Sequence, residues 1–386
     1  MTLLPLDREL LTDASGPADL PRPRSTVREL PAYVAGRRAD CAAVAALASN
    51  ESHFPPLPSV LEVVAHSAAT LNRYPDNGAL ELRESIAGHL GVDPVEVAVG
   101  PGSTGVLQQI ITAVCDAGDE VVFAWRSFEA YPILTRLAGA VPVMVPLDAQ
   151  EGHDLAAMAA AITDRTRLVI VCTPNNPTGV SLGQAALESF LAEVPSRVLV
   201  VIDEAYIEYA RPATEAAADP ATDAAVADSV ALYRAHPNVC VLRTFSKAYG
   251  LAGLRVGYAV AAPAIADGLR RTGMPFAVSA IAQRAAIASL EPVAATEIAA
   301  RVGAVTAERE RMIGELRLQG WVTPDSLANF VWLRMPDDRR ELVVDLLARN
   351  DILVRAYAGA GVRISIADRA SNDRVLAVLA SVAPAL

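Results

Sequence analysis

The chain has 386 residues, of which 52% are hydrophobic and 20% charged, so it can bury a large core. Its 33 basic and 44 acidic side chains give a formal net charge of -11, the opposite of the sign that favours nucleic-acid binding. The cysteines (Cys41, Cys115, Cys172, Cys240) lie far apart, so we expect neither a metal site nor a disulfide framework. Without an apolar stretch of signal-peptide or membrane-span character, the sequence predicts a cytoplasmic protein.

The elements expected along the chain indicate an α/β fold. Residues 1–40, rich in Pro and Arg, form an N-terminal arm. From 73 to 291, apolar β-branched runs alternate with helical patterns, which is typical of a mostly parallel sheet covered by helices on both faces. The expected strands are 95–100, 120–124, 141–145, 167–172, 197–203, 238–244 and 255–260. The expected helices between them are 104–117, 128–139, 154–163 and 182–193.

The last part of the chain has a different texture. A long charged helix over 292–319 is followed by short strands and further helical patterns. We therefore divide the chain into the arm, a large domain over 73–291, and a smaller α+β domain formed by 41–72 and 292–386. The stretch 211–229, made of Ala, Pro and acidic residues, is interpreted as a solvated surface insertion.

The basic residues include a single lysine. Of the 33 basic side chains, 32 are arginine and one is Lys247, in TFSKAYGLAGLR. Arginine does not readily lose its proton, whereas a lysine amine can become a nucleophile and form a Schiff base. Survival of one surface lysine by chance is the alternative interpretation.

Polar residues follow the predicted strands, where ligands bind in open α/β sheets. After 95–100 comes GPGSTG, whose Ser103 and Thr104 can offer backbone N–H groups to a phosphate at a helix N-terminus. The same loop matches G-x-G-x-x-G, so a dinucleotide site is an alternative, although Asp119 and Glu120 come before the second strand instead of at its end. A tight turn without a ligand is also possible.

Further strand ends add complementary chemistry. Phe128 could lie on a planar ring, and Asn176 either caps a turn or contacts a ligand. Asp203 ends a buried strand, where a carboxylate is costly without a positive partner, and Tyr206 adds a phenol. The hydroxyl of Ser246, the amine of Lys247 and the guanidinium of Arg255 complete the set. Together these groups describe pyridoxal 5'-phosphate as the cofactor.

The chain resembles fold-type I pyridoxal-phosphate-dependent aminotransferases over nearly its whole length, and most closely the histidinol-phosphate and aromatic amino acid aminotransferase group. The matching segments are LASNE (47–51), RYPD (73–76), TPNNPTG (173–179), VIDEAYIEY (201–209), TFSKAYGLAGLRVGY (244–258) and VRISI (362–366). The resemblance implies a large domain with a mostly parallel seven-stranded sheet covered by helices, plus a smaller α+β domain. It also implies a homodimer with shared active sites.

The resemblance implies a role for each matching residue. Lys247 would form the Schiff base and move the reacting proton, and Asp203 would hold the pyridine nitrogen protonated. Tyr206 and Asn176 would bond the ring hydroxyl, while Phe128 stacks on the ring. The cofactor phosphate would be held by Ser103, Thr104, Thr244, Ser246 and Arg255, with Tyr74 from a second subunit.

Substrate contacts are implied in the same way. Arg363 would grip the substrate carboxylate and Arg355 would meet the distal end, although both could be ordinary charges at strand edges. Asn50 and Tyr33 are expected at the entrance.

Two departures from the histidinol-phosphate pattern bear on the substrate. They are Thr104 after the Gly-Ser of the phosphate loop and Phe128 in place of tyrosine at the stacking position. They favour transfer of the amino group of phenylalanine or tyrosine to 2-oxoglutarate by a ping-pong mechanism, with histidinol phosphate as the alternative donor. Rival functions are a decarboxylase or lyase on the same fold, a nicotinamide-dependent oxidoreductase, and a binding-only protein.

Overall fold

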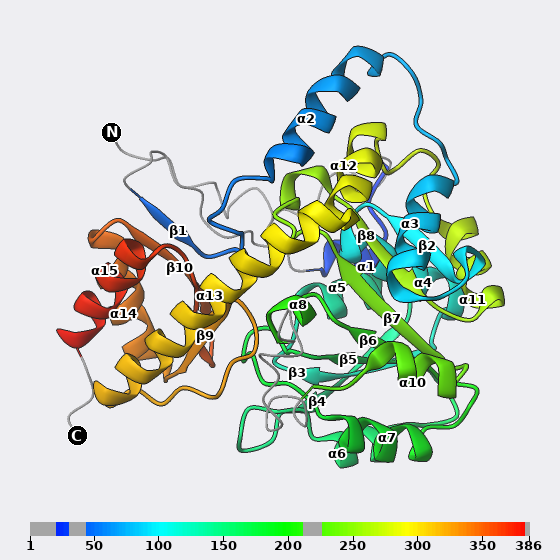
Figure 1. Cartoon of the computed structure of the whole chain (residues 1–386). Helices are drawn as coiled ribbons and strands as arrows, with labels where there is room; N and C mark the ends of the chain where they lie inside the picture. Colours follow the sequence, from blue (N-terminus) through cyan, green and yellow to red (C-terminus); the bar gives the residue numbers. More distant parts are fainter. Residues whose placement is uncertain (1–20, 31–43, 211–225, 383–386) are drawn as a thin grey trace.

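The computed structural model describes residues 21–30, 44–210 and 226–382 (Figure 1). Tyr33, Cys41 and most of the predicted insertion at 211–229 lie outside the described residues. Of the N-terminal arm, the described part holds one short helix, α1 (Ser25–Arg28). Among the described residues, no helix has the length and apolar character needed to cross a membrane.

The central element is a seven-stranded sheet with strand order β2-β8-β7-β6-β5-β3-β4. All neighbours are parallel except β8, which runs antiparallel to β2 and β7. The strands are β2 (Val97–Gly100), β3 (Glu120–Trp125), β4 (Val141–Pro146), β5 (Thr166–Cys172), β6 (Leu199–Asp203), β7 (Val239–Thr244) and β8 (Gly257–Val260). The predicted fold class, with its mostly parallel sheet, is confirmed.

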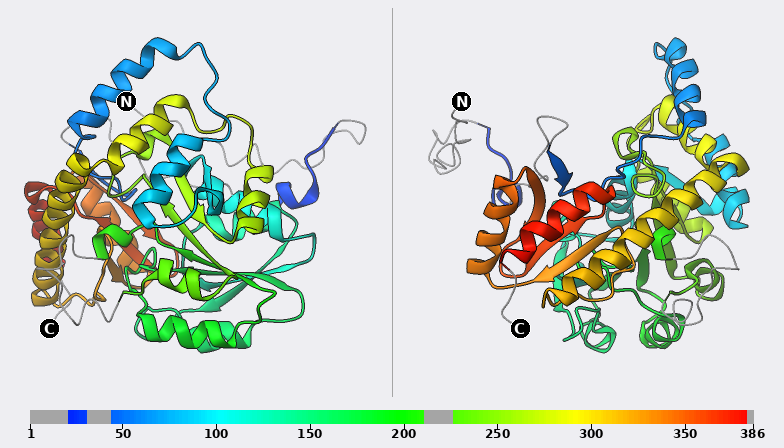
Figure 2. Two further views of the ribbon diagram at one scale, coloured as in Figure 1. Left: turned by 45° about the vertical axis from the view of Figure 1, so that its right-hand side comes forward. Right: turned by 60° about the vertical axis from the view of Figure 1, so that its left-hand side comes forward.

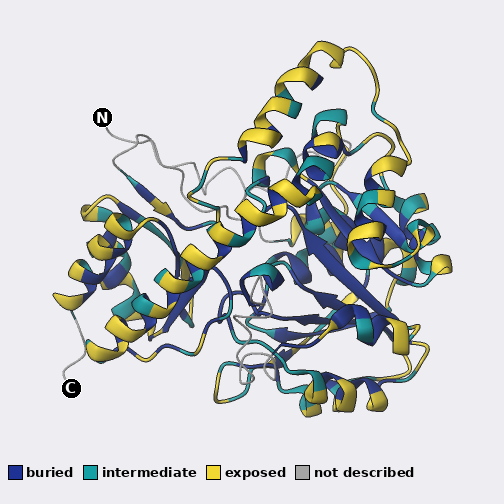
Figure 3. Cartoon of the chain, viewed as in Figure 1, coloured by how far each residue is buried: buried dark blue, intermediate teal, exposed yellow. Residues whose placement is uncertain are grey.

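Helices cover both faces of this sheet because alternate strand residues point to opposite sides. In β6, Val200 and Ile202 join one hydrophobic cluster, and Leu199 and Val201 join the other. The first face carries α3 (Leu80–Leu90), α7 (Gln184–Glu193), α10 (Ser229–Ala235) and α12 (Ala280–Leu290). The second carries α4 (Gly102–Val114), α5 (Ala130–Leu137) and α11 (Pro263–Thr272). Apart from the edge strand β4, whose residues are mostly exposed or half-buried, the strands are almost wholly buried, whereas the outer faces of the helices are exposed (Figure 3).

A second, four-stranded sheet has the order β1-β10-β11-β9. Its strands are β1 (Ala45–Leu47), β9 (Phe330–Arg334), β10 (Ile352–Tyr357) and β11 (Gly361–Ser365). Its helices are α14 (Asp337–Arg349), α15 (Arg369–Ala380) and the last turns of α13 (Pro292–Leu318), which gather on one side of the molecule (Figure 2). Strand β1 pairs in parallel with β10, and the segment after β1 meets the large sheet where the carbonyl oxygen of Ser49 accepts a hydrogen bond from Lys247, just after β7.

The remaining helices connect these layers. Helix α2 (Pro58–Ser67), which we assigned to the small domain, packs against α12 of the large sheet's first face. Helix α6 (Leu155–Ala160) packs near α7, and the short α8 (Ile207–Ala210) directly follows the end of β6 and contacts α13. The long α13 therefore runs from the large sheet to the small one.

Candidate active site

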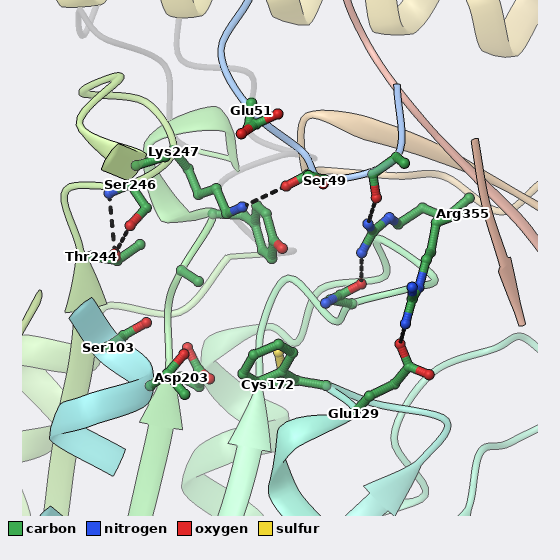
Figure 4. A pocket seen from close by; sticks show the side chains of 18 of the residues that line it. Ser49, Glu51, Ser103, Glu129, Cys172, Asp203, Thr244, Ser246, Lys247 and Arg355 are labelled. Carbon is green, nitrogen blue, oxygen red and sulfur yellow. Dashed lines mark hydrogen bonds and ion pairs between the residues drawn. The ribbon is translucent and has the colours of Figure 1, made fainter. Parts of the chain in front are cut away.

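A cavity of about 300 Å³ lies at the carboxyl ends of β5, β6 and β7, and residues from both sheets line it (Figure 4). Most of the residues predicted for the site are brought together there. They are Ser103, Thr104, Phe128, Asn176, Asp203, Tyr206, Thr244, Ser246, Lys247, Arg255, Arg355 and Arg363.

Lys247 follows β7 and extends into the cavity. Its Nζ donates a hydrogen bond to the carbonyl oxygen of Ser49, at 2.9 Å, and lies 5.9 Å from the ring centre of Tyr206. Burial lowers the pKa of Lys247 to about 7, and the nearby Arg363 guanidinium acts in the same direction. A large fraction of this amine is therefore uncharged near neutral pH, as a nucleophile or proton acceptor requires.

Asp203 ends β6 at the floor of the cavity. Its Oδ2 accepts a hydrogen bond of 2.6 Å from the hydroxyl of Tyr131, whereas its Oδ1 is buried without a hydrogen-bond partner in the described chain. Burial raises the pKa of Asp203 to about 6, and the bond from Tyr131 opposes this. A buried, unpaired carboxylate oxygen is costly, so Asp203 fits a ligand that brings a positive N–H group.

Tyr206 lies three residues after Asp203, and a hydrogen bond from Asn50 fixes its hydroxyl. Its hydroxyl accepts a hydrogen bond of 3.0 Å from Nδ2 of Asn50, and Ser365 donates to Oδ1 of the same asparagine at 2.9 Å. We predicted Asn50 at the entrance, but it is only 1% exposed and lies behind Tyr206 instead. It is therefore placed to orient the phenol.

Arg363, on β11, reaches the cavity from the small sheet. Its Nη1 donates to Oδ1 of Asn176 and, at 3.0 Å, to the hydroxyl of Tyr357, and its Nη2 donates to the carbonyl oxygen of Ala48 at 2.6 Å. Its Nε is buried and has no hydrogen-bond partner among the described residues. This guanidinium is rigidly held and retains a donor for a carboxylate.

Arg355, on β10, lies opposite Arg363 in the strand pairing and forms an ion pair with Glu129 inside the cavity (Figure 4). Glu129 directly follows Phe128, so the apolar ring and the ion pair border the same end of the site. The pair leaves this end without net charge.

The opposite end of the cavity is built for an anion. Ser103 and Thr104 lie in the first turn of α4, where backbone N–H groups are unsatisfied. Nη1 of Arg255 donates to Oγ of Ser246 at 3.3 Å, and the hydroxyls of Thr244 and Ser246 are 3.0 Å apart.

Glycines make room for this anion-binding end. A Cβ on Gly102 would come within 2.2 Å of Nη2 of Arg255, and one on Gly257 would come within 2.2 Å of the backbone nitrogen of Ser103. Gly102 also has φ +75°, which side chains rarely adopt. The close approach of these segments therefore requires glycine at both positions.

Tyr74 lies apart from the cavity. It is 83% exposed, and its ring stacks on Phe276 with the ring centres 4.7 Å apart. Within one chain it contributes nothing to the cavity lining.

Two functional residues were missed in the sequence. Tyr131, in the first turn of α5, binds Asp203, and its ring packs edge-on against Phe128 with the ring centres 5.6 Å apart. Its position three residues after Phe128 was a usable signal. Glu129 gave no signal, because only the tertiary fold brings it to Arg355, 226 residues away.

Comparison with known proteins agrees with this geometry. The aminotransferase class I and II family matches residues 42–379. The aromatic amino acid aminotransferase of Streptomyces coelicolor is 50% identical over 360 residues, which cover 93% of this chain and 96% of that protein. The one from Rhodococcus opacus is 51% identical over 361 residues, covering 94% and 96%. The histidinol-phosphate aminotransferase of Sinorhizobium meliloti, solved with pyridoxal 5'-phosphate, superposes with a TM-score of 0.82 at 29% identity, covering 95% of this chain and 98% of that one.

The fold and the site thus define a transaminase with the fold-type I architecture. The protein belongs to the aminotransferase class I and II family, whose members depend on pyridoxal phosphate. The histidinol-phosphate aminotransferase of Sinorhizobium meliloti is related to this protein in fold.

Proposed function

We propose that this protein transfers the amino group of phenylalanine or tyrosine to 2-oxoglutarate, with pyridoxal 5'-phosphate as cofactor. The ion pair between Arg355 and Glu129 beside Phe128 carries the proposal, because it leaves the side-chain end of the cavity uncharged and partly apolar. An uncharged aromatic side chain can be buried in such a site without the free-energy cost of removing a charge from water. The relatives at about 50% identity that are named aromatic amino acid aminotransferases support the same substrate class.

The described residues fit the cofactor. The unpaired Oδ1 of Asp203 would accept a hydrogen bond from the pyridinium nitrogen, and Phe128 would lie against the ring. The phosphate would lie among the first turn of α4, Ser246 and Arg255. When bound, pyridoxal phosphate supplies an electron sink for negative charge at the substrate Cα.

The chain's own groups then do the proton chemistry. Lys247, with a pKa near 7, would take the proton from the substrate Cα and deliver it to C4′ of the cofactor. Tyr206, oriented by Asn50, would hold the ring oxygen, and Arg363 would bind the substrate carboxylate with its remaining donor. The ping-pong order follows from the use of one cavity for both substrates.

Histidinol phosphate is the other donor to test, because of the structural neighbour from Sinorhizobium meliloti. To reach Arg355, its phosphate would have to approach Glu129, which is paired with that arginine, and two negative charges in close contact repel each other. We therefore expect the holoenzyme to show a higher kcat/KM for phenylalanine than for histidinol phosphate, with 2-oxoglutarate as acceptor. The reverse order would refute the proposed donor, and activity with neither would refute both.

We also propose a homodimer in which Tyr74 reaches the cofactor phosphate of the partner subunit. Its exposed ring, outside the cavity of its own chain, supports this arrangement. The test mixes Tyr74→Ala with Lys247→Ala under conditions that exchange subunits. Hybrid dimers regain one intact site, so we expect activity to recover to about a quarter of wild type, as statistical mixing of a C2 dimer predicts. No recovery above the two parent variants would contradict a shared site.

A further inference from the structure

A second cavity of about 350 Å³ lies outside the active site, and it shares no lining residue with the first. Helices α3, α8, α12 and α13 and strand β7 contribute to it. Its apolar wall consists of Ile207, Leu290, Ala295, Ile298, Ala299 and Val302.

The polar side of this cavity contains a buried ion pair that is already satisfied. Nε of Arg243 donates to Oε2 of Glu204 at 2.7 Å, and Oγ of Ser229 donates to Oε1 of the same glutamate at 2.6 Å. The Glu204 side chain is fully buried, and Arg243 is 8% exposed. The charge of Arg243 is therefore balanced within the protein.

Glu208, on α8, is different. Its Oε2 is buried and has no hydrogen-bond partner among the described residues, and Glu208 lines the cavity. Leaving a buried acceptor unpaired costs about 1–3 kcal/mol, so the site favours a molecule that brings a donor.

The ionisable groups around Glu208 determine which ligand charge the cavity favours. They are Glu204, Tyr209, Arg243, Tyr249, Tyr258 and His89. Burial raises the pKa of the three tyrosines and lowers that of His89, so these groups are uncharged near pH 8. Burial also raises the pKa of Glu208 to about 7, and Arg243 opposes the rise. The lining residues from α12 and α13 carry no charge.

We propose that this cavity is a second ligand site, which takes a small organic ammonium ion with an apolar body. The ammonium group would donate to Oε2 of Glu208, and the apolar body would lie against Ile298 and Val302 of α13. The site is independent of the transamination proposed above, since its polar groups take no part in that chemistry.

The test uses N,N-dimethylbenzylamine, a tertiary amine that cannot form a Schiff base with the cofactor. Calorimetric titration of the wild-type holoenzyme at pH 8 should show saturable binding of one amine per chain. Glu208→Gln removes the charge but keeps the shape, and it should weaken binding about tenfold or more, as loss of a charge-assisted hydrogen bond predicts. Glu341→Gln, on the exposed face of α14, is the matched control and should bind like wild type.

Two further measurements distinguish loss of the binding site from misfolding or an indirect effect of Glu208→Gln. Ala299→Phe, at a half-buried position of α13, should block the cavity without removing any polar group. At pH 6.5, where part of Glu208 is protonated, binding should release protons in wild type and not in Glu208→Gln. Absence of binding to wild type, equal binding to Glu208→Gln, or preferential binding of benzoate would overturn the proposal.

Discussion

Replacement of Glu129 by glutamine should shift the substrate preference of the enzyme toward dicarboxylic acids. Arg355 and Glu129 are 12% and 29% exposed and form a charge-assisted hydrogen bond, so a distal carboxylate must displace Glu129 to reach the arginine. The charge-assisted hydrogen bond between Glu129 and Arg355 contributes about 1.5–3 kcal/mol. Glutamine keeps an acceptor oxygen but removes the competing charge, so this contribution should fall by about 1.4 kcal/mol. This corresponds to about a tenfold gain in kcat/KM for 2-oxoglutarate.

Phenylalanine should respond in the opposite direction. In Glu129→Gln its ring would lie beside an arginine without a counter-ion, and burying that charge is unfavourable. The assay measures kcat/KM for 2-oxoglutarate and phenylalanine in each half-reaction. Glu151→Gln is the control, because Glu151 forms a 2.8 Å ion pair with Arg334 outside the cavity lining. An unchanged ratio of the two kcat/KM values in Glu129→Gln, or the same ratio change in both variants, would refute this reasoning.

Three other changes give separate tests. In the wild-type apoenzyme, the free energy of unfolding should rise between pH 7 and 9.5, because the unfolded lysine still binds a proton in this range and the folded amine, with its pKa of about 7, does not. Lys247→Met should abolish this rise, and urea unfolding at each pH would detect the difference. Tyr131→Phe should raise the pKa of Asp203 above about 6, so the loss of cofactor affinity on acidification should begin at higher pH, as equilibrium dialysis would show. Gly257→Ala pushes a methyl group into the backbone of Ser103, and cofactor affinity should fall about tenfold or more with little loss of secondary structure, measured by fluorescence titration and circular dichroism.

The sequence by itself determined the architecture of the large sheet. Its strands are short, apolar and β-branched, and a crossover helix separates most of the parallel ones, so local pattern and topology agree. The helix predicted over 104–117 begins at Gly102 and ends at Val114, because Cys115 is extended. Helix ends depend on the local chain path, which hydrophobic pattern records poorly.

The sequence also predicted which polar residues meet at the strand ends, and the structure brings them to one cavity. Lys247 and Asp203 were found because a lone lysine and a carboxylate after a buried strand are unusual, and parallel strands deliver their carboxyl ends to one edge.

Only the tertiary structure decided how these residues are supported and where the small sheet meets them. The hydrogen bond from Asn50 to Tyr206 spans 156 residues, and the ion pair of Arg355 with Glu129 spans 226. The buried Oε2 of Glu208, which has no hydrogen-bond partner among the described residues, is equally invisible in the sequence, since α13 packs near α8 only in the tertiary structure. Side-chain partners of this kind depend on distances between elements far apart in the chain, and no local pattern of residues encodes those distances.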